Sequence, residues 1–273
     1  MTLQPNGFWR STRTPEGPAT QRIRATATDS FEVTAWGPGA KWLVDRAPVL
    51  TGANDDHGSF PDHHGELFRL HRRFHRLRFA CTQAVFETLF PVVLEQKVTV
   101  RESRSSYGRL VRHFGESAPG PGNNVGPPLL LPPDPGAVEK APSHVFHAAN
   151  VERQRSSTIK RAAASAPRLE AAAGAGGGDV RELLKILPGI GEWSIAEILT
   201  QAFGDADAVS VGDFHLKNWV SWNLAGEPRG SDTEMVQLLE PFRPFRGRVL
   251  RLLQLGGNPP PRYGPRLTIQ KRW

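Results

Sequence analysis

The most regular pattern of apolar and polar positions lies in the segment that follows Gly191. Apolar side chains recur there at intervals of three and four residues, which is the spacing of a helix with one buried face. They are Ile195, Ile198, Leu199, Ala202 and Phe203. Gly204 ends the pattern, so the sequence predicts a helix over 192–203.

A second group of apolar residues precedes that helix and consists of Leu183, Leu184, Ile186 and Leu187. Asp179 can cap a helix at this point and Glu182 stands three residues later, which is the capping-box pattern. The Pro-Gly pair at 188–189 then stops the helix. We therefore expect a helix over 180–187 and a short turn before the next one.

Alternating polar and apolar residues, rich in β-branched side chains, dominate the start of the chain. Residues 21–28 and 31–36 show this period of two, 37–39 (Gly-Pro-Gly) is a turn, and 41–44 could return as a further strand. The pattern predicts a small antiparallel sheet. Between 67 and 79, arginines interleave with leucine, phenylalanine and histidine, which is typical of a solvated helix face and less often of a phosphate contact.

Two segments have the composition of loops. Residues 117–135 are rich in proline and glycine and precede a short helix expected near Gly136, while 162–178 ends in a run of alanine and glycine. The fold class that follows is α+β, with an N-terminal antiparallel β-sheet lobe and a mainly helical body. We expect the β-rich lobe over 1–80, a helical body that could contain two subdomains over 81–257, and a proline-rich basic tail over 258–273.

The turn between the two predicted helices has the chemistry of a phosphate site. A Gly-x-Gly turn exposes consecutive backbone N–H groups, and a phosphate can approach glycine closely because glycine has no Cβ. Gly189 and Gly191 supply that pattern, and a carboxylate, Asp213, follows the second predicted helix. An ordinary helical hairpin would explain an isolated Gly-x-Gly, but the aspartate favours an enzyme that acts on nucleic acid.

Four segments together resemble one known family. They are Leu-Pro-Gly-Ile-Gly-Glu-Trp at 187–193, Val-Ser-Val-Gly-Asp-Phe-His-Leu at 209–216, Phe-Glu-Thr-Leu-Phe-Pro-Val-Val-Leu-Glu-Gln-Lys-Val at 86–98, and Leu-Glu-Pro-Phe-Arg-Pro-Phe-Arg at 239–246 leading into 249–253. Over residues 80–257 or so, the chain resembles the helix-hairpin-helix (HhH-GPD) DNA glycosylases, and most of all their bacterial 3-methyladenine DNA glycosylase II branch. The hairpin and the aspartate are the specific part of this resemblance.

The resemblance implies a base-excision repair enzyme that flips a damaged nucleotide out of double-stranded DNA and hydrolyses its N-glycosidic bond, with alkylated purines such as 3-methyladenine and 7-methylguanine as substrates. Asp213 would be the catalytic carboxylate, which stabilises positive charge on the sugar and orients water. Its alternative role is to cap a helix that starts at Phe214, and the two roles can coexist. Relatives that also cut the strand carry a lysine where this chain has Trp193, so the enzyme is expected to be monofunctional.

The resemblance also assigns the residues that would hold the DNA. The hairpin would be Leu187, Pro188, Gly189, Ile190 and Gly191. The wedge that enters the DNA would be Gln96, Lys97 and Val98, although an aliphatic residue is easier to explain at Lys97, so Val98 or a residue of the 118–131 loop is an alternative. Further DNA contacts would come from Arg243 and Arg246.

The expected base pocket consists of Trp193, Glu197 and Gln254. Trp193 and Glu197 stand one helical turn apart, opposite the apolar stripe of the 192–203 helix. Gln254 stands where the resembled branch tends to place a stacking aromatic. A second layer of packing would explain Trp193 as well as a pocket does, and a surface ion pair is the alternative for Glu197.

Composition agrees with a DNA partner and limits the cofactors. The chain has 34 Lys and Arg against 27 Asp and Glu, a net charge of +7 and a pI near 10.1, which suits a polyanion. Cys81 is the only cysteine, which excludes internal disulfides and a four-cysteine iron–sulfur cluster. We expect no cofactor and no catalytic metal, because the Asp and His residues of 54–57 and 62–64 lack a spacing that fixes ligand geometry, and we allow for a monovalent cation at the hairpin.

The sequence has no apolar run of 18 residues and no N-terminal basic-then-apolar signal. We therefore expect a cytoplasmic, nucleoid-associated monomer that binds no membrane. Two other functions stay open: a protein that binds DNA damage or abasic sites without excision, and a glycosylase for oxidised or deaminated bases. Asp213 favours an enzyme over the first, and nothing in the sequence decides against the second.

Overall fold

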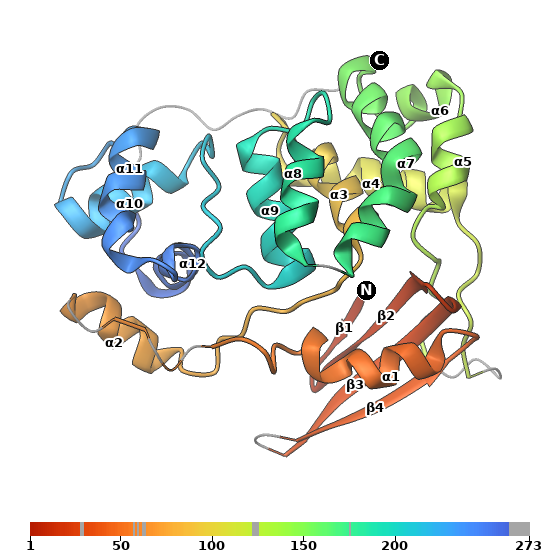
Figure 1. Ribbon diagram of the computed structural model, residues 1–273, viewed down its shortest axis with the longest axis horizontal. Coiled ribbons are helices and arrows are strands. Elements are labelled where there is room, and N and C mark those ends of the chain that lie inside the picture. The colour runs from red at the N-terminus through yellow and green to blue at the C-terminus, as the bar shows by residue number, and fades with distance from the viewer. Residues whose placement is uncertain are drawn as a thin grey trace. The chain divides into compact units, whose positions relative to one another are not determined.

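The computed structural model describes residues 1–27, 30–56, 58, 60–61, 64–121, 126–174 and 176–261. The chain divides into two compact units. Unit 1 contains Met1–Leu50 and Phe86–Glu170, and unit 2 contains Thr51–Val85 and the described part of Ala171–Ile269. The chain therefore passes twice through each unit (Figure 1).

Unit 1 begins with the predicted antiparallel sheet, which has four strands in sequential order. They are β1 (Thr2–Gln4), β2 (Gly7–Thr14), β3 (Gly17–Ala27) and β4 (Ser30–Trp36). Strand β4 covers the predicted segment 31–36, and β3 covers 21–27 of the other, whose residue 28 lies outside the described residues. The other two strands carry a weaker alternating pattern, and they complete a meander in which each strand pairs with its neighbour in sequence.

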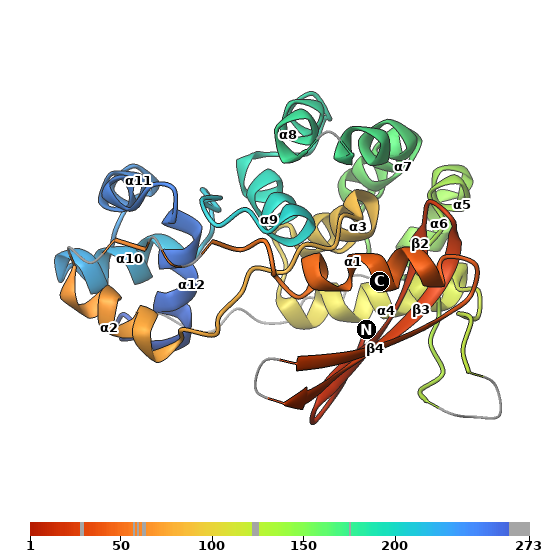
Figure 2. The same cartoon turned by 60° about the horizontal axis from the view of Figure 1, so that its bottom comes forward.

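The strand predicted over 41–44 is wrong, because this segment lies in helix α1 (Ala40–Leu50). The Gly-Pro-Gly turn before it is confirmed, and Gly37 O accepts the hydrogen bond from Ala40 N at 3.0 Å that starts the helix. Leu43, Ala47 and Leu50 are buried, a spacing of four and three residues that a window of four residues cannot reveal. Helix α1 packs on the sheet, where Ala47 and Leu50 share a core cluster with Ile23 (Figure 2).

The other regular elements described in unit 1 are helices, namely α3 (Val85–Glu95), α4 (Val100–Phe114), α5 (Pro135–Lys140), α6 (Ser143–Ala148) and α7 (Arg153–Ala173). Helix α3 confirms the helix expected at the start of 86–98. It is tied to the sheet by Glu87, whose Oε1 accepts from Arg10 Nη2 at 3.1 Å. Helix α5 begins where predicted, after Asp134 accepts a capping bond from Ala137 N.

The described part of the 117–135 segment is irregular, as predicted, with one bridge between Ser117 and Leu130. The linker predicted over 162–178 is largely wrong, because α7 continues to Ala173. Alanine has the highest helix propensity. Three alanines of this helix, Ala162, Ala163 and Ala166, are buried within unit 1. Composition alone cannot distinguish an alanine-rich linker from a helix whose small residues allow close packing.

Unit 2 is helical in its described part, and its helices are α2 (Gly65–Arg73), α8 (Gly177–Lys185), α9 (Glu192–Phe203), α10 (Leu216–Ala225), α11 (Asp232–Leu239), the short η1 (Glu240–Phe242) and α12 (Arg246–Gly256). Helix α9 has the predicted bounds. Helix α8 starts earlier than predicted, with Gly176 at the N-cap, so Asp179 lies in the first turn and forms no capping box. Negative charge in the first turn still favours the helix.

The segment before α3 belongs with the C-terminal helices and not with the sheet, which differs from the boundary expected near residue 80. Phe60, Leu67 and Leu70 share a buried core with α10, α11 and α12. Asp55 forms a buried ion pair with Arg248, and the two side chains are 3% and 1% exposed. Of the expected tail, only 258–261 lies within the described residues. No helix in the described ranges is long and apolar enough to cross a bilayer.

Candidate active site

The turn at 187–191 joins α8 to α9 and leaves its backbone open to solvent. Pro188, Gly189 and Gly191 are exposed, while Ile190 is buried and fixes the turn to the unit. Gly189 has φ +95°, a conformation that favours glycine. Gly191 has an ordinary φ of −108°, and no atom lies within 4 Å of the place where a Cβ would stand. Gly191 is the N-cap of α9, a position that favours glycine, and the open space beside it also leaves room for a ligand.

Asp213 lies half-buried in the loop between α9 and α10, and three donors fix its carboxylate. Its Oδ1 accepts from His215 N at 2.7 Å and from Leu216 N at 3.0 Å. Its Oδ2 accepts from Trp193 Nε1 at 3.4 Å. Helix α10 begins at Leu216 and not at Phe214 as expected, and its N-cap is His215, whose side chain makes no capping bond. Asp213 still accepts from the backbone N–H groups of the N-cap and of the first helical residue. The carboxylate is thus held in one orientation by the helix that follows it.

Glu197 lies one turn beyond Trp193 on α9 and reaches the same loop. Its Oε1 accepts from Ser210 Oγ at 2.6 Å, and Ser210 is only 5% exposed. Burial raises the pKa of Glu197; the charge of Asp213 adds to that rise, and the hydrogen bond from Ser210 opposes it. Helix α9 therefore contacts the Asp213 loop twice, through Trp193 and through Glu197.

Ser210 is a site residue that the sequence reading missed. Serine is common in loops, and nothing in its spacing from Glu197, thirteen residues away, indicates a contact. The helical spacing of Trp193 and Glu197 did predict that these two side chains share a face, and the structure brings both to Asp213 or to its loop.

Gln254, the third expected pocket residue, is exposed on α12. Its Oε1 lies 3.5 Å from Nη1 of Arg251, one turn earlier on the same helix. The contacts that join Trp193, Glu197 and Asp213 do not include it. Its role in the base pocket stays a prediction.

Arg243 and Arg246, expected as DNA contacts, are engaged with carboxylates of their own unit. Arg246 binds Asp207 through Nη2 at 2.6 Å and Glu240 through Nη1 at 3.1 Å, and it is 14% exposed. The hydrogen bond to Asp207 raises the pKa of Arg246. Arg243 binds the same two carboxylates but is 55% exposed. Arg246 mainly fixes the start of α12, and a DNA contact stays a prediction for both.

The expected wedge residues lie in unit 1, between α3 and α4. Lys97 is exposed and has φ +54°, a left-handed conformation that is uncommon for lysine. Gln96 and Val98 on either side are half-buried. A strained, exposed residue at a turn is compatible with a contact to a ligand, and the assignment stays a prediction.

The alternative wedge, the 118–131 loop, is partly packed in unit 1. Ala118 N donates to Leu129 O at 2.9 Å, and Ser11 Oγ donates to Leu130 O at 2.7 Å. Gly126 lies against the ring of Trp9. Residues 122–125 lie outside the described part of the chain.

Within the described ranges, no group of three or more His, Cys, Asp or Glu side chains could hold a metal ion. His57, Asp62 and His63 of the polar loop lie outside those ranges. A monovalent cation at the hairpin stays a prediction. Cys81 is half-buried and its Sγ donates to Ala202 O.

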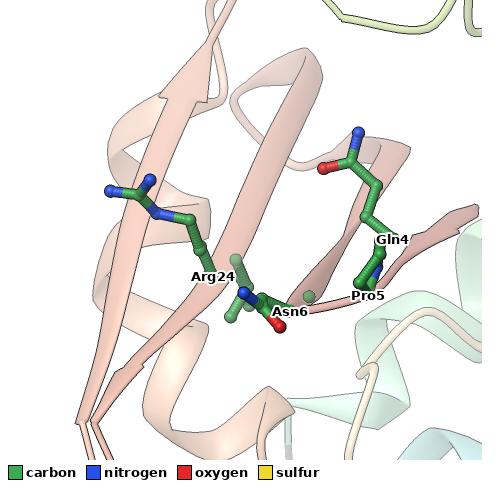
Figure 3. A pocket seen from close by; sticks show the side chains of 6 residues that line it. Gln4, Pro5, Asn6 and Arg24 are labelled. Carbon is green, nitrogen blue, oxygen red and sulfur yellow. The ribbon is translucent and has the colours of Figure 1, made fainter.

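A separate hollow of about 270 Å³ lies at one end of the sheet in unit 1. It is lined by Gln4, Pro5, Asn6, Gly7, Ile23 and Arg24, and Asn6 lies between Gln4 and Arg24 (Figure 3). Arg24 is already paired with Glu32. None of the expected site residues lines this hollow, so it is distinct from the Asp213 site.

No protein-family model and no curated protein sequence matches the chain, but solved structures match it over most of its length. A 3-methyladenine DNA glycosylase from Archaeoglobus fulgidus matches with a TM-score of 0.77 at 16% identity, covering 92% of this chain and 88% of that one. The chain has the fold of the helix-hairpin-helix DNA glycosylases. The α+β fold class expected from the sequence is thereby confirmed, and the expected resemblance to these glycosylases is supported at the level of the fold.

Two further solved structures with this fold are glycosylases named for different bases. The 8-oxoguanine glycosylase/lyase of Clostridium acetobutylicum matches with a TM-score of 0.65 at 14% identity, covering 90% of this chain and 87% of that one. The 3-methyladenine DNA glycosylase Mag1 of Schizosaccharomyces pombe, in complex with abasic DNA, matches with a TM-score of 0.56 at 16% identity, covering 70% and 91%. Glycosylases with different substrates therefore share this fold. The substrate has to be inferred from the residues of the site and not from the fold.

Proposed function

We propose that the protein is a monofunctional DNA glycosylase that excises alkylated purines from double-stranded DNA. The observation that carries this proposal is the fixed carboxylate of Asp213. It is held by two backbone N–H groups and by Trp193, which is the second residue after the open Gly-x-Gly turn. One helix therefore starts at a candidate phosphate site and supports a candidate catalytic carboxylate.

Excision of a base requires both the site that holds the DNA and the carboxylate. A base within a duplex cannot be attacked in place, so its nucleotide must be extruded, at a cost of a few kcal/mol that damaged pairs reduce. Breaking the N-glycosidic bond then develops positive charge on the sugar. The Asp213 carboxylate would stabilise that charge and orient the attacking water, and its three hydrogen bonds hold it in place before the reaction begins.

Alkylated purines suit this site better than oxidised ones. Bases such as 3-methyladenine and 7-methylguanine carry a positive charge that already makes them good leaving groups, so their release needs a pocket and Asp213 but no strong general acid. The solved structures with this fold include both 3-methyladenine and 8-oxoguanine enzymes. Trp193 also stands where strand-cutting relatives carry lysine, which argues for simple hydrolysis.

A methylated duplex tests the proposal. Incubation with the protein should create sites that break only on later treatment with alkali, and an unmodified duplex should yield none. Tight binding to the methylated duplex with no alkali-labile sites would instead indicate a protein that recognises damage without excision.

Borohydride treatment during the reaction is expected to trap no covalent protein–DNA adduct. Trapping requires an amine that forms a Schiff base with the sugar, and Trp193 cannot supply one. Denaturing gel electrophoresis of a labelled duplex measures the adduct. Efficient trapping would mean that another amine acts as the nucleophile, and Lys217, near the site but engaged with Asp232 at 3.7 Å, would be the first to replace.

Replacing Gly191 with leucine is expected to weaken binding to damaged and undamaged duplexes alike, by about tenfold, the equivalent of one hydrogen bond to a charged group. Phosphate contacts position a protein on DNA without reading bases, and the affinity should fall steeply with salt. Gly178→Leu is the matched control, because Gly178 is an exposed glycine on α8 that also has open space around its Cβ position. Unchanged duplex affinity in Gly191→Leu would mean that the phosphate does not bind at this turn.

A further inference from the structure

Helix α4 of unit 1 presents positive charge to solvent (Figure 2). Its single acidic residue, Glu102, is engaged at the start of the helix, where Oε2 accepts from Thr99 N at 3.0 Å and from Thr99 Oγ1 at 2.7 Å. The exposed side chains of the helix are those of Val100, Ser105, His113 and four arginines, namely Arg101, Arg104, Arg109 and Arg112.

The charges of the four arginines are not compensated. None of them forms an ion pair within the described part of the chain. Arg109 donates Nη1 to the carbonyl of Ala148 at 3.2 Å, which satisfies a donor and leaves the charge in place. Like charges one turn apart, such as those of Arg101 and Arg104, repel each other on a helix. An anionic partner would remove this repulsion.

The arginines are spaced along one side of a straight element. Arg101 and Arg112 are separated by close to three full turns, so they share a face, and a rise of about 1.5 Å per residue places them roughly 16 Å apart along the axis. Duplex DNA carries one negative charge per about 1.7 Å of its own axis. A basic face of this length can therefore meet several phosphates at once.

The middle of this face has small side chains. Ser105 and Gly108 lie between Arg104 and Arg112. A Cβ at Gly108 would meet only the guanidinium of Arg112, with Nη1 at 3.5 Å, which is the end of a flexible side chain. Glycine weakens the interior of a helix. Packing does not require it at this point, and the missing Cβ leaves room for a ligand to approach the helix closely.

We propose that this side of α4 binds the phosphate backbone of double-stranded DNA. The inference rests on the proposed function only in taking duplex DNA as the partner, and it adds a surface in unit 1 to the candidate phosphate site at the hairpin turn. Arginine binds phosphate through charge-assisted hydrogen bonds, and such contacts hold a protein on DNA without reading its bases. We call Arg101, Arg104, Ser105, Gly108 and Arg112 the α4 basic face.

A lipid surface fits these residues less well. Helices that lie on membranes insert a wide apolar face between the lipids. The side of α4 that contains Leu110 is buried in unit 1, and Val100 is the one exposed apolar residue of the helix. The α4 basic face therefore offers charge for an anionic backbone and little apolar area for a bilayer.

The test is the salt dependence of binding to an undamaged duplex, measured by fluorescence anisotropy. Each lost phosphate contact lowers the slope of log affinity against log salt by about 0.9. Arg104→Gln should lower the slope by about that amount, and Arg101→Gln combined with Arg104→Gln by about twice as much, with a loss of affinity of about tenfold at low salt. Glutamine is close to arginine in helix propensity, so α4 should be retained.

Lys41→Gln is the matched control for the single variant. It removes one positive charge from an exposed helix of the same unit, but Lys41 is already paired with Asp45 at 2.5 Å. The control should keep the slope of the wild type, which separates a local contact from the effect of net charge.

Gly108→Leu distinguishes a binding face from a solvated one. Leucine is a better helix former than glycine, so the Tm of the protein should rise. Duplex affinity should nevertheless fall, because the added side chain blocks close approach of the backbone. A raised Tm with unchanged affinity would contradict a contact at this point.

Two further results would overturn the inference. Slopes equal to that of the wild type in both arginine variants would show that α4 does not contact DNA. Loss of binding to vesicles of anionic phospholipid, with duplex binding unchanged, would assign the face to a lipid surface. A failure of the proposed function is distinguishable, because the wild type would then bind the duplex with the expected slopes in the variants and form no alkali-labile sites in methylated DNA.

Discussion

Asp213→Asn is expected to lower the rate of base excision by about 10² or more while leaving duplex affinity and folding unchanged. Asparagine keeps the shape of the side chain, and its oxygen can still accept from the backbone N–H groups of His215 and Leu216. What it loses is the negative charge that meets the developing positive charge on the sugar. Single-turnover base release from a methylated duplex measures the effect.

Asp179→Asn provides the matched control for this substitution. Asp179 is an exposed carboxylate in the first turn of α8, so its replacement removes the same charge from the same unit without touching the α9–α10 loop. The control variant should excise at a rate close to that of the wild type. Near-normal excision by Asp213→Asn would reject the proposed mechanism even if the control behaves as expected.

Arg248→Met is expected to lower the free energy of unfolding of unit 2 by roughly 3–5 kcal/mol, the cost of leaving one member of a buried ion pair alone. Arg248 binds Asp55 and packs over the ring of Phe79, with its Cζ 5.0 Å from the ring centroid. Asp55 Oδ2 also accepts from Phe79 N at 2.9 Å. The pair thus attaches the segment before α3 to helix α12.

Urea denaturation followed by circular dichroism measures this loss. Glu66→Gln is the control, because it breaks an exposed pair with Arg69 in the same unit and should change stability little. The double variant Asp55→Leu with Arg248→Met should recover part of the loss, because no buried charge is then left unpaired. A loss in Arg248→Met no larger than in the control would mean that the pair does not hold this segment in place.

The hairpin and its aspartate were predictable from the sequence because their signals are local. The apolar stripe of α9 spans a full helix and ends at a glycine, so both its bounds were predicted correctly. Gly189, Gly191 and Asp213 stand in a compact, specific motif. The helical period also placed Trp193 and Glu197 on one face, which the contacts to Asp213 and Ser210 bear out.

The predictions that were wrong used a short-range sequence pattern or the composition where the structure depends on packing. The segment 41–44 is apolar enough for a strand, but the sheet beside it is better covered by a helix, whose buried positions extend to Leu50. The alanine-rich segment before Gly174 resembled a linker, although burial of its small side chains stabilises a long helix.

The partners of the charged residues could not be predicted, because they come from distant parts of the chain. Arg246 was expected at the DNA and lies against Asp207, 39 residues away. Arg248 and Asp55 are 193 residues apart, and their pairing joins the segment before α3 to the C-terminal helices. Sequence spacing predicts on which face of a helix a side chain lies. The ion-pair partner of a charged side chain depends on the fold.

The most direct measurement is the identity of what the wild-type protein releases from methylated double-stranded DNA, determined by mass spectrometry of the small-molecule fraction. The account predicts free 3-methyladenine and 7-methylguanine, equal in amount to the abasic sites formed, and their disappearance in Asp213→Asn. DNA that is bound but retains all its methylated bases, or bases released equally well by Asp213→Asn, would contradict it.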